Sequence, residues 1–105
     1  MSVLLDLGGD WCIDCRRLDA FFRNNTAARA ELERNFVLVK VYVGDERDNS
    51  AFLMNLPSFN WVPYFFVLDW NGKLLGAQDT RDLTVNREFQ AGKVQAFLRR
   101  WTVKK

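Results

Sequence analysis

Residues 3–16 read VLLDLGGDWCIDCR, an apolar run that leads through two glycines into two cysteines separated by two residues. The run from Val3 to Leu7, interrupted only by Asp6, is typical of a buried strand, and Gly8-Gly9 is typical of a tight turn. Asp10 is a candidate cap for a helix that follows. The stretch therefore predicts a strand, a turn and a helix, with both cysteines in the first helical turn.

The spacing of Cys12 and Cys15 suits reversible dithiol–disulfide chemistry, since two intervening helical residues leave the sulfurs close enough to bond. The helix N-terminus favours a thiolate, so Cys12 is the expected exposed nucleophile and Cys15 the more buried, resolving thiol. The charge of Asp14 opposes the Cys12 thiolate, whereas Arg16 and Arg17 favour it, and the sign of the net effect stays open. A static disulfide closing so short a loop would stabilise little. The pair therefore indicates redox chemistry.

Composition narrows the alternatives. The 105 residues form one expected domain, residues 1–105, with 49% hydrophobic and 27% charged residues. The chain has no histidine and two cysteines, which excludes a four-ligand Cys/His zinc site within one chain and any histidine-assisted nucleophile. No metal site and no bound cofactor are expected, and an iron–sulfur cluster could form only between two chains.

The charge and the apolar pattern bear on partners and compartment. A net charge of +2 is too small to indicate a nucleic-acid partner. No apolar run approaches the roughly 20 residues of a membrane span. Nothing at the amino end resembles a signal peptide, so the sequence as given indicates a cytoplasmic protein, or a periplasmic one if the natural start lies upstream. A monomer is expected.

The rest of the chain alternates between apolar runs and breaks. Phe36 to Val43 predicts a strand buried on both faces, with Lys40 in its middle, and Tyr64 to Leu68 predicts another. Asn71-Gly72 predicts a two-residue hairpin turn. Three further helices are predicted: one capped by Thr26 that contains Leu32, one over Ser50–Leu56 that Pro57 ends, and a last one with Val94, Phe97, Leu98 and Trp101 on one face. A short strand is predicted over Lys73–Leu75. The segments Gly44–Asn49 and Gln78–Gln90 are predicted to be a polar segment and a polar loop.

The predicted order is strand, helix, strand, helix, strand, strand, helix, an α/β protein with a four-stranded mixed sheet. In this setting residues 5–16 resemble the strand, active-site turn and helix start of the thioredoxin family. Val62-Pro63 before a strand and an Asn-Gly-Lys turn resembles that family's cis-proline loop, and Lys40 falls where the family has a lysine. The resemblance extends from Val3 to Trp101. It is nearest to the thioredoxin-like and disulfide-isomerase-like bacterial branch, here with a Trp-Cys-x-Asp-Cys motif, and implies a minimal thioredoxin fold.

Residues other than the cysteines also have candidate roles. Asp6 is expected to be a buried acid with a raised pKa that takes the Cys15 proton; the alternative is a structural ion pair with Lys40, and the two are compatible. A cis Pro63 would leave the backbone of Val62 free to pair with an extended substrate. Trp11 and Trp61 are candidates for an apolar rim, although Trp61 fits the core equally well.

These features indicate a thiol–disulfide oxidoreductase acting on protein or peptide disulfides, with an unidentified dithiol as electron donor or acceptor. One alternative is an isomerase or oxidant in an oxidising compartment. A second is a non-catalytic thioredoxin-like module that binds peptides or bridges a cluster between two chains.

Overall fold

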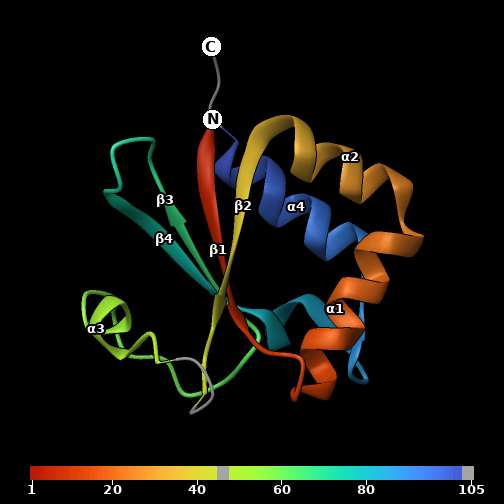
Figure 1. Cartoon of the computed structure of the whole chain (residues 1–105). Coiled ribbons are helices and arrows are strands. Elements are labelled where there is room, and N and C mark those ends of the chain that lie inside the picture. Colours follow the sequence, from red (N-terminus) through yellow and green to blue (C-terminus); the bar gives the residue numbers. More distant parts are fainter. Residues whose placement is uncertain (45–47, 103–105) are drawn as a thin grey trace.

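A four-stranded mixed sheet forms the centre of the molecule, as the computed structural model of residues 1–44 and 48–102 shows (Figure 1). The strand order is β2-β1-β3-β4. Strand β1 pairs in parallel with β2 and antiparallel with β3, which pairs antiparallel with β4. The strands are β1 (Ser2–Gly8), β2 (Phe36–Tyr42), β3 (Tyr64–Leu68) and β4 (Leu74–Asp79). The predicted four-stranded mixed sheet is confirmed.

Helices cover both faces of the sheet unequally. Helices α1, α2 and α4 lie on one face and the short α3 lies on the other (Figure 1). Their bounds are α1 (Ile13–Asn24), α2 (Thr26–Asn35), α3 (Ser50–Leu53) and α4 (Ala91–Trp101). Among residues 1–44 and 48–102, none of the helices has both the length and the apolar character needed to cross a membrane.

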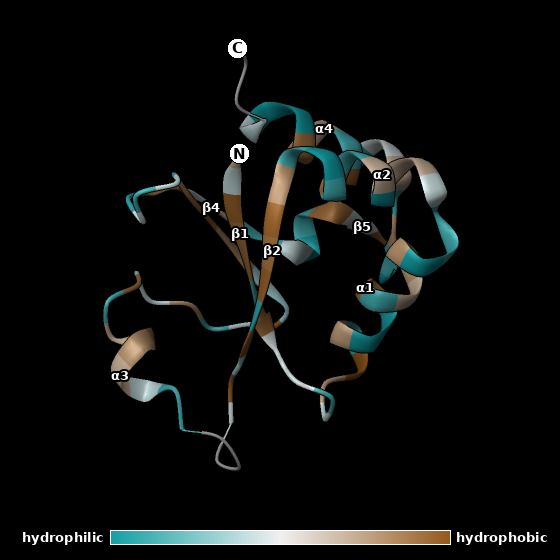
Figure 2. Ribbon diagram, turned by 45° about the horizontal axis from the view of Figure 1, so that its top comes forward, coloured by the Kyte–Doolittle hydropathy of each residue, from teal (hydrophilic) through white to brown (hydrophobic). Residues whose placement is uncertain are grey.

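The core has two parts because side chains of a strand alternate between the faces of the sheet. Leu5 and Leu7 pack with Phe66 on the face that α3 covers. Leu4 packs with Phe65 and residues of α1, α2 and α4 on the other face. Figure 2 shows hydrophobic colouring along β1 and β2 and hydrophilic segments on the outer helices. Asp6, two residues after Leu4, points to the helix-covered side, which places a carboxylate beneath α1.

The helix caps differ from the sequence-based expectation. The N-cap of α1 is Cys12, not Asp10, because a turn in which the Cys12 N–H donates to the Gly9 carbonyl (3.1 Å) delays the helix by two residues. The N-cap of α2 is Asn25, not Thr26. Its extended backbone ends α1, and its side-chain oxygen accepts the N–H of Ala28 at 3.0 Å. The first correction places a cysteine sulfur in the capping position.

Strand β2 is an edge strand, so the expectation of burial on both faces is wrong. Leu38 and Val39 are each 40% exposed and Lys40 is exposed as well. The continuous apolar run was typical of a central strand, but sheet order puts β1, not β2, in the middle. Lys40 therefore reaches solvent from the sheet edge.

The segment from residue 69 to residue 90 is more structured than predicted. Residues 69–73, not two residues, connect β3 to β4, and β4 is longer than the expected Lys73–Leu75. The expected loop over Gln78–Gln90 contains the end of β4, the 3-10 helix η1 (Thr80–Leu83) and the hairpin β5 (Thr84–Val85) to β6 (Glu88–Phe89). Elements this short give no readable periodicity.

Two further expectations concern the segment around α3. The predicted helix over Ser50–Leu56 shortens to Ser50–Leu53, since Pro57 disfavours helical backbone in the residue before it. Of the polar segment Gly44–Asn49, residues 45–47 lie outside the described residues. The predicted apolar face of the last helix is confirmed: Val94, Phe97 and Leu98 are buried in the core and Trp101 packs against it.

Candidate active site

The two cysteines lie at the N-terminus of α1 as free thiols. The Cys12 sulfur accepts the backbone N–H of Cys15 at 3.1 Å, one of the donors that a helix start leaves unsatisfied. The same N-terminal dipole and N–H groups favour negative charge on that sulfur. The geometry therefore distinguishes the cysteines: Cys12 holds the capping position and Cys15 lies within the helix.

Cys12 is less accessible than the sequence predicted. Its side chain is 7% exposed, against 8% for Cys15, so the expected contrast in exposure is wrong. The Cys12 sulfur turns toward its own helix, and its thiol faces the Val62 carbonyl oxygen at 3.6 Å. The loop before β3 therefore covers the sulfur.

The loop over Val62-Pro63 is fixed against the 3-10 helix. The peptide bond between Val62 and Pro63 is cis, and Pro63 is buried. The Pro63 carbonyl accepts a hydrogen bond from the hydroxyl of Thr80, which is itself buried. Sequence reasoning missed Thr80 because it placed the residue in an unstructured loop. This contact connects the backbone that faces Cys12 to the start of η1.

Two tryptophans flank the cysteine pair at the surface. Trp11 is 54% exposed, and its indole N–H donates to the Val43 carbonyl at 2.9 Å. Trp61 is 37% exposed, and the Arg81 guanidinium lies 4.7 Å from its ring centroid. The alternative placement of Trp61 in the core is therefore wrong, and both rings present apolar surface beside the motif.

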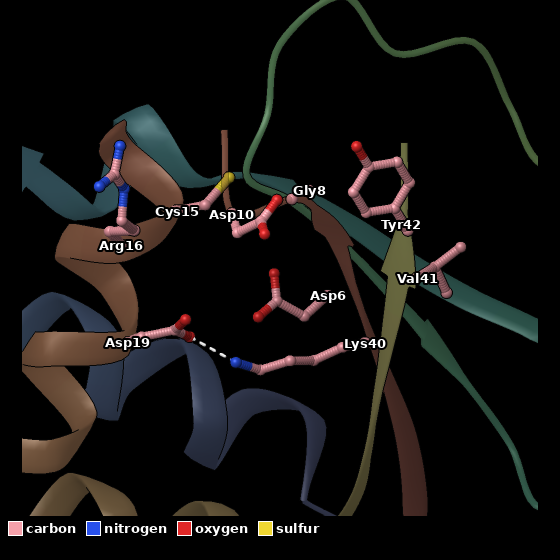
Figure 3. A pocket seen from close by; sticks show the side chains of 10 residues that line it. Asp6, Gly8, Asp10, Cys15, Arg16, Asp19, Lys40, Val41 and Tyr42 are labelled. Atoms are coloured by element: carbon pink, nitrogen blue, oxygen red, sulfur yellow. Dashed lines mark hydrogen bonds and ion pairs between the residues drawn. The ribbon is translucent and has the colours of Figure 1, made fainter. Parts of the chain in front are cut away.

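Asp6 and Cys15 line the same cavity, which has a volume of about 330 Å³ (Figure 3). Burial raises the pKa of Asp6 to about 7; the charge of Lys40 opposes this rise and that of Asp19 adds to it. Burial, followed by the hydrogen bond with Cys12, raises the pKa of the Cys15 thiol well above its usual range. A thiol that holds its proton thus shares a cavity with a carboxylate that ionises near neutral pH.

Lys40 does not make the ion pair with Asp6 that the sequence suggested. The register of β1 and β2 sets Asp6 directly opposite Lys40. The Lys40 ammonium instead donates to an Asp19 carboxylate oxygen at 2.7 Å. Sequence reasoning missed Asp19, although it follows Cys15 by four residues and so shares its helix face.

Asp14, between the cysteines, is bonded to two arginines. Its carboxylate lies 3.1 Å from Arg17 and 3.5 Å from Arg87. Arg87 belongs to the two-residue turn between β5 and β6, where Asn86 and Arg87 have φ of 50° and 66°. Arg87 could not be predicted to lie here, because the hairpin was not recognised. The negative charge within the motif is therefore offset from two directions.

The described residues offer little to a metal ion. Within ranges 1–44 and 48–102, no group of three cysteine, histidine, aspartate or glutamate side chains is arranged to hold one.

Gly8 is required for the approach of the Cys15 sulfur to β1. A Cβ at residue 8 would lie 2.5 Å from that sulfur. We expect Gly8→Ala to displace the side chain of Cys15 and to lower the free energy of unfolding by about 1–3 kcal/mol. Gly92→Ala is the matched control, since a Cβ there meets nothing within 4 Å and alanine favours helix α4. Thermal unfolding of both variants measures the difference, and equal stability would contradict the stated contact.

The order of strands and helices and the two cysteines at a helix start are consistent with a thioredoxin-like protein. A sequence model of the thioredoxin-like family matches residues 1–69, and the chain belongs to that family. Among solved structures, the disulphide isomerase from Xylella fastidiosa Temecula1 is similar, with a TM-score of 0.76 and 26% identity over 94% of this chain and 76% of that chain. Comparison with curated proteins found no match. These findings confirm the expected thioredoxin-like fold and support a role of the thiol–disulfide oxidoreductase kind.

Proposed function

We propose that the protein is a thiol–disulfide oxidoreductase that exchanges disulfides of protein or peptide substrates through Cys12 and Cys15. The observation that supports this most strongly is the position of the two thiols. Cys12 caps the helix N-terminus, and Cys15 shares a cavity with an acid of raised pKa. Membership of the thioredoxin-like family and the similarity to a disulphide isomerase favour the same chemistry.

The first step is attack by the Cys12 thiolate on one sulfur of a substrate disulfide. The substrate S–S bond breaks, one substrate thiolate leaves and takes a proton from solvent, and a mixed disulfide joins Cys12 to the other substrate sulfur. The N–H of Cys15 that now contacts the Cys12 sulfur would stabilise its negative charge before attack.

The second step releases the substrate. Asp6 accepts the Cys15 proton, and the Cys15 sulfur attacks the Cys12 sulfur of the mixed disulfide. The bond between Cys12 and the substrate breaks, the Cys12–Cys15 disulfide forms, and the second substrate sulfur leaves as a thiolate that takes a proton from solvent. Two electrons have then passed from the enzyme dithiol to the substrate. A dithiol donor resets the enzyme, and the same steps in reverse oxidise a substrate.

Substrate binding is assigned to the surface around the sulfur. The backbone of Val62 would pair with an extended peptide next to Cys12, as strand addition does elsewhere. Trp11 and Trp61 would supply apolar contact on either side, which suits amphipathic rings at a peptide-binding surface.

Reduction of insulin disulfides in the presence of dithiothreitol tests the proposal. We expect the protein to accelerate precipitation of the reduced chains well above the rate with dithiothreitol alone. A rate equal to that background would contradict catalysis and leave the peptide-binding or cluster-bridging module. Iron content and colour of the purified protein separate those two.

The second candidate function is that of an isomerase or oxidant, which the structural similarity to a disulphide isomerase favours. The reduction potential separates the directions. A value near −270 mV, about that of a reductant, supports a reductase, and a value of about −120 to −180 mV supports an isomerase or oxidant.

A further inference from the structure

Three charged side chains form one cluster between the cysteine motif and the sheet edge. Asp6, Asp19 and Lys40 line both the cavity of about 330 Å³ that contains Cys15 and a neighbouring cavity of about 480 Å³. In Figure 3 the Lys40 side chain extends past Asp6 toward Asp19, and the Asp6 carboxylate lies between that side chain and Cys15. The cluster therefore lies beside the thiol whose proton Asp6 is proposed to accept.

Lys40 does not form its ion pair with Asp6, the residue opposite it in the register of the sheet. Lys40 lies opposite Asp6 across β1 and β2, yet its ammonium is 2.7 Å from Asp19. The Lys40 and Asp19 side chains are 58% and 41% exposed, and ion pairs this exposed contribute little to folding. The pair matters more for the position of the Lys40 charge, which it holds beside Asp19, than for the stability of the fold.

We propose that Asp19 is a positioning residue that holds the Lys40 ammonium away from the Asp6 carboxylate and so sets the pH range in which Asp6 accepts the Cys15 proton. This inference rests on the proposed function, since it assigns a role within the second step. A cation beside a carboxylate favours its ionised form and weakens it as a base. Asp19 keeps that cation out of direct ion-pair contact with Asp6 and adds a negative charge, and both effects keep Asp6 protonated to higher pH.

Other charged or titratable groups line the two cavities that Asp6 lines. They are Asp10 before α1; Cys15, Arg16 and Arg23 on α1; Arg29 and Glu33 on α2; and Tyr42 on β2. Arg29 and Glu33 approach each other at 3.9 Å. The charges that shift the pKa of Asp6 are nevertheless those of Lys40, which lowers it, and Asp19, which raises it. The test therefore changes these two side chains.

The experiment separates the two steps with dithiobis(nitrobenzoate), a chromogenic aromatic disulfide, at equal concentration with the reduced protein. Attack by Cys12 releases one nitrothiobenzoate, and attack by Cys15 on the mixed disulfide releases the second. The rate of the second release is measured against pH by stopped-flow absorbance.

Asp19→Ala is expected to shift the midpoint of the second release to lower pH. One pH unit below the midpoint of the unsubstituted protein, its rate should rise roughly two- to fivefold, with a smaller gain at high salt because the groups are exposed. Lys40→Met should shift the midpoint upward. In the Lys40→Met background, Asp19→Ala should have a smaller effect, since no ammonium remains to be released. Glu33→Ala, which removes the same charge from α2, is the matched control and should leave the midpoint unchanged.

Three results would overturn the inference. The first is a midpoint pH of the second release that is the same in Asp19→Ala as in Glu33→Ala. The second is a midpoint in Asp19→Ala that lies at higher pH than in the unsubstituted protein. The third is a shift caused by Asp19→Ala that is equally large in the Lys40→Met background. The last would show that Asp19 acts by its own charge and not through Lys40. Failure of the proposed function looks different, because the unsubstituted protein would then not accelerate the reduction of insulin disulfides, whatever the pH dependence of the second release.

Discussion

Replacing Cys12 with serine is expected to lower the rate of insulin reduction by at least about a thousandfold, which is the scale of effect seen when a nucleophile is removed. A hydroxyl at this position does not form the required anion at neutral pH. Cys15 cannot take over, because burial raises the pKa of its thiol, which therefore keeps its proton at neutral pH. The measurement is the turbidity assay with dithiothreitol as donor, corrected for the uncatalysed rate.

The same variant controls for folding. Cys12 is the N-cap of α1, and its sulfur accepts the Cys15 N–H. Serine is a preferred N-cap residue, so Cys12→Ser should unfold at the same temperature as the unsubstituted protein or a higher one. Loss of activity with stability retained identifies the sulfur as the reacting group. Activity within a few-fold of the unsubstituted protein would contradict the assignment of Cys12 as nucleophile.

Replacing Asp6 with asparagine is expected to slow release of the substrate by roughly a hundredfold above pH 7, the usual contribution of a positioned general base. The amide cannot accept the Cys15 proton, and the thiol, whose pKa burial raises, must then lose it to water. Attack by Cys12 should keep its rate. Stopped-flow release of the two chromophores measures both steps, and equal slowing of both would contradict the assigned role.

Asp6→Asn should also change how stability depends on pH. Burial raises the pKa of Asp6 from its ordinary value of 3.8 to about 7, so the folded protein binds a proton that the unfolded chain has lost. The free energy of unfolding should therefore fall by up to about 4 kcal/mol as the pH rises from about 4 to about 7. The variant lacks this decline and should be the more stable protein at pH 8. Urea unfolding at several pH values measures it, and parallel pH profiles would exclude a raised pKa of Asp6.

The parts of the fold predicted correctly are those that strong local patterns specify. The apolar run before Gly8-Gly9 and the apolar face of α4 have lengths and periods that identify a strand and a helix. The position of β2 at the sheet edge depends on the order of all four strands, and its own apolar residues do not report it. The same limit applies to the hairpin over residues 84–89, whose strands have two residues each.

The candidate site shows a similar division. Cys12, Cys15 and Asp6 were found because they lie in one continuous stretch, and the strand-to-helix turn brings them together. Asp19 and Arg87 enter the site through packing of α1 on the sheet and of the β5–β6 hairpin on α1. Sequence distance does not report these contacts. The burial of Cys12 was also missed, since the covering carbonyl belongs to Val62, fifty residues away.

Trapping the mixed disulfide tests the central claim most directly. Cys15→Ala retains the nucleophile and removes the resolving thiol, so reaction with oxidised insulin should stop after the first step. Mass spectrometry should then find one insulin molecule joined through Cys12, in a complex that dithiothreitol dissociates, and no such complex in the double variant that also carries Cys12→Ser. Absence of the adduct from Cys15→Ala, or its formation without Cys12, would contradict disulfide exchange through this pair.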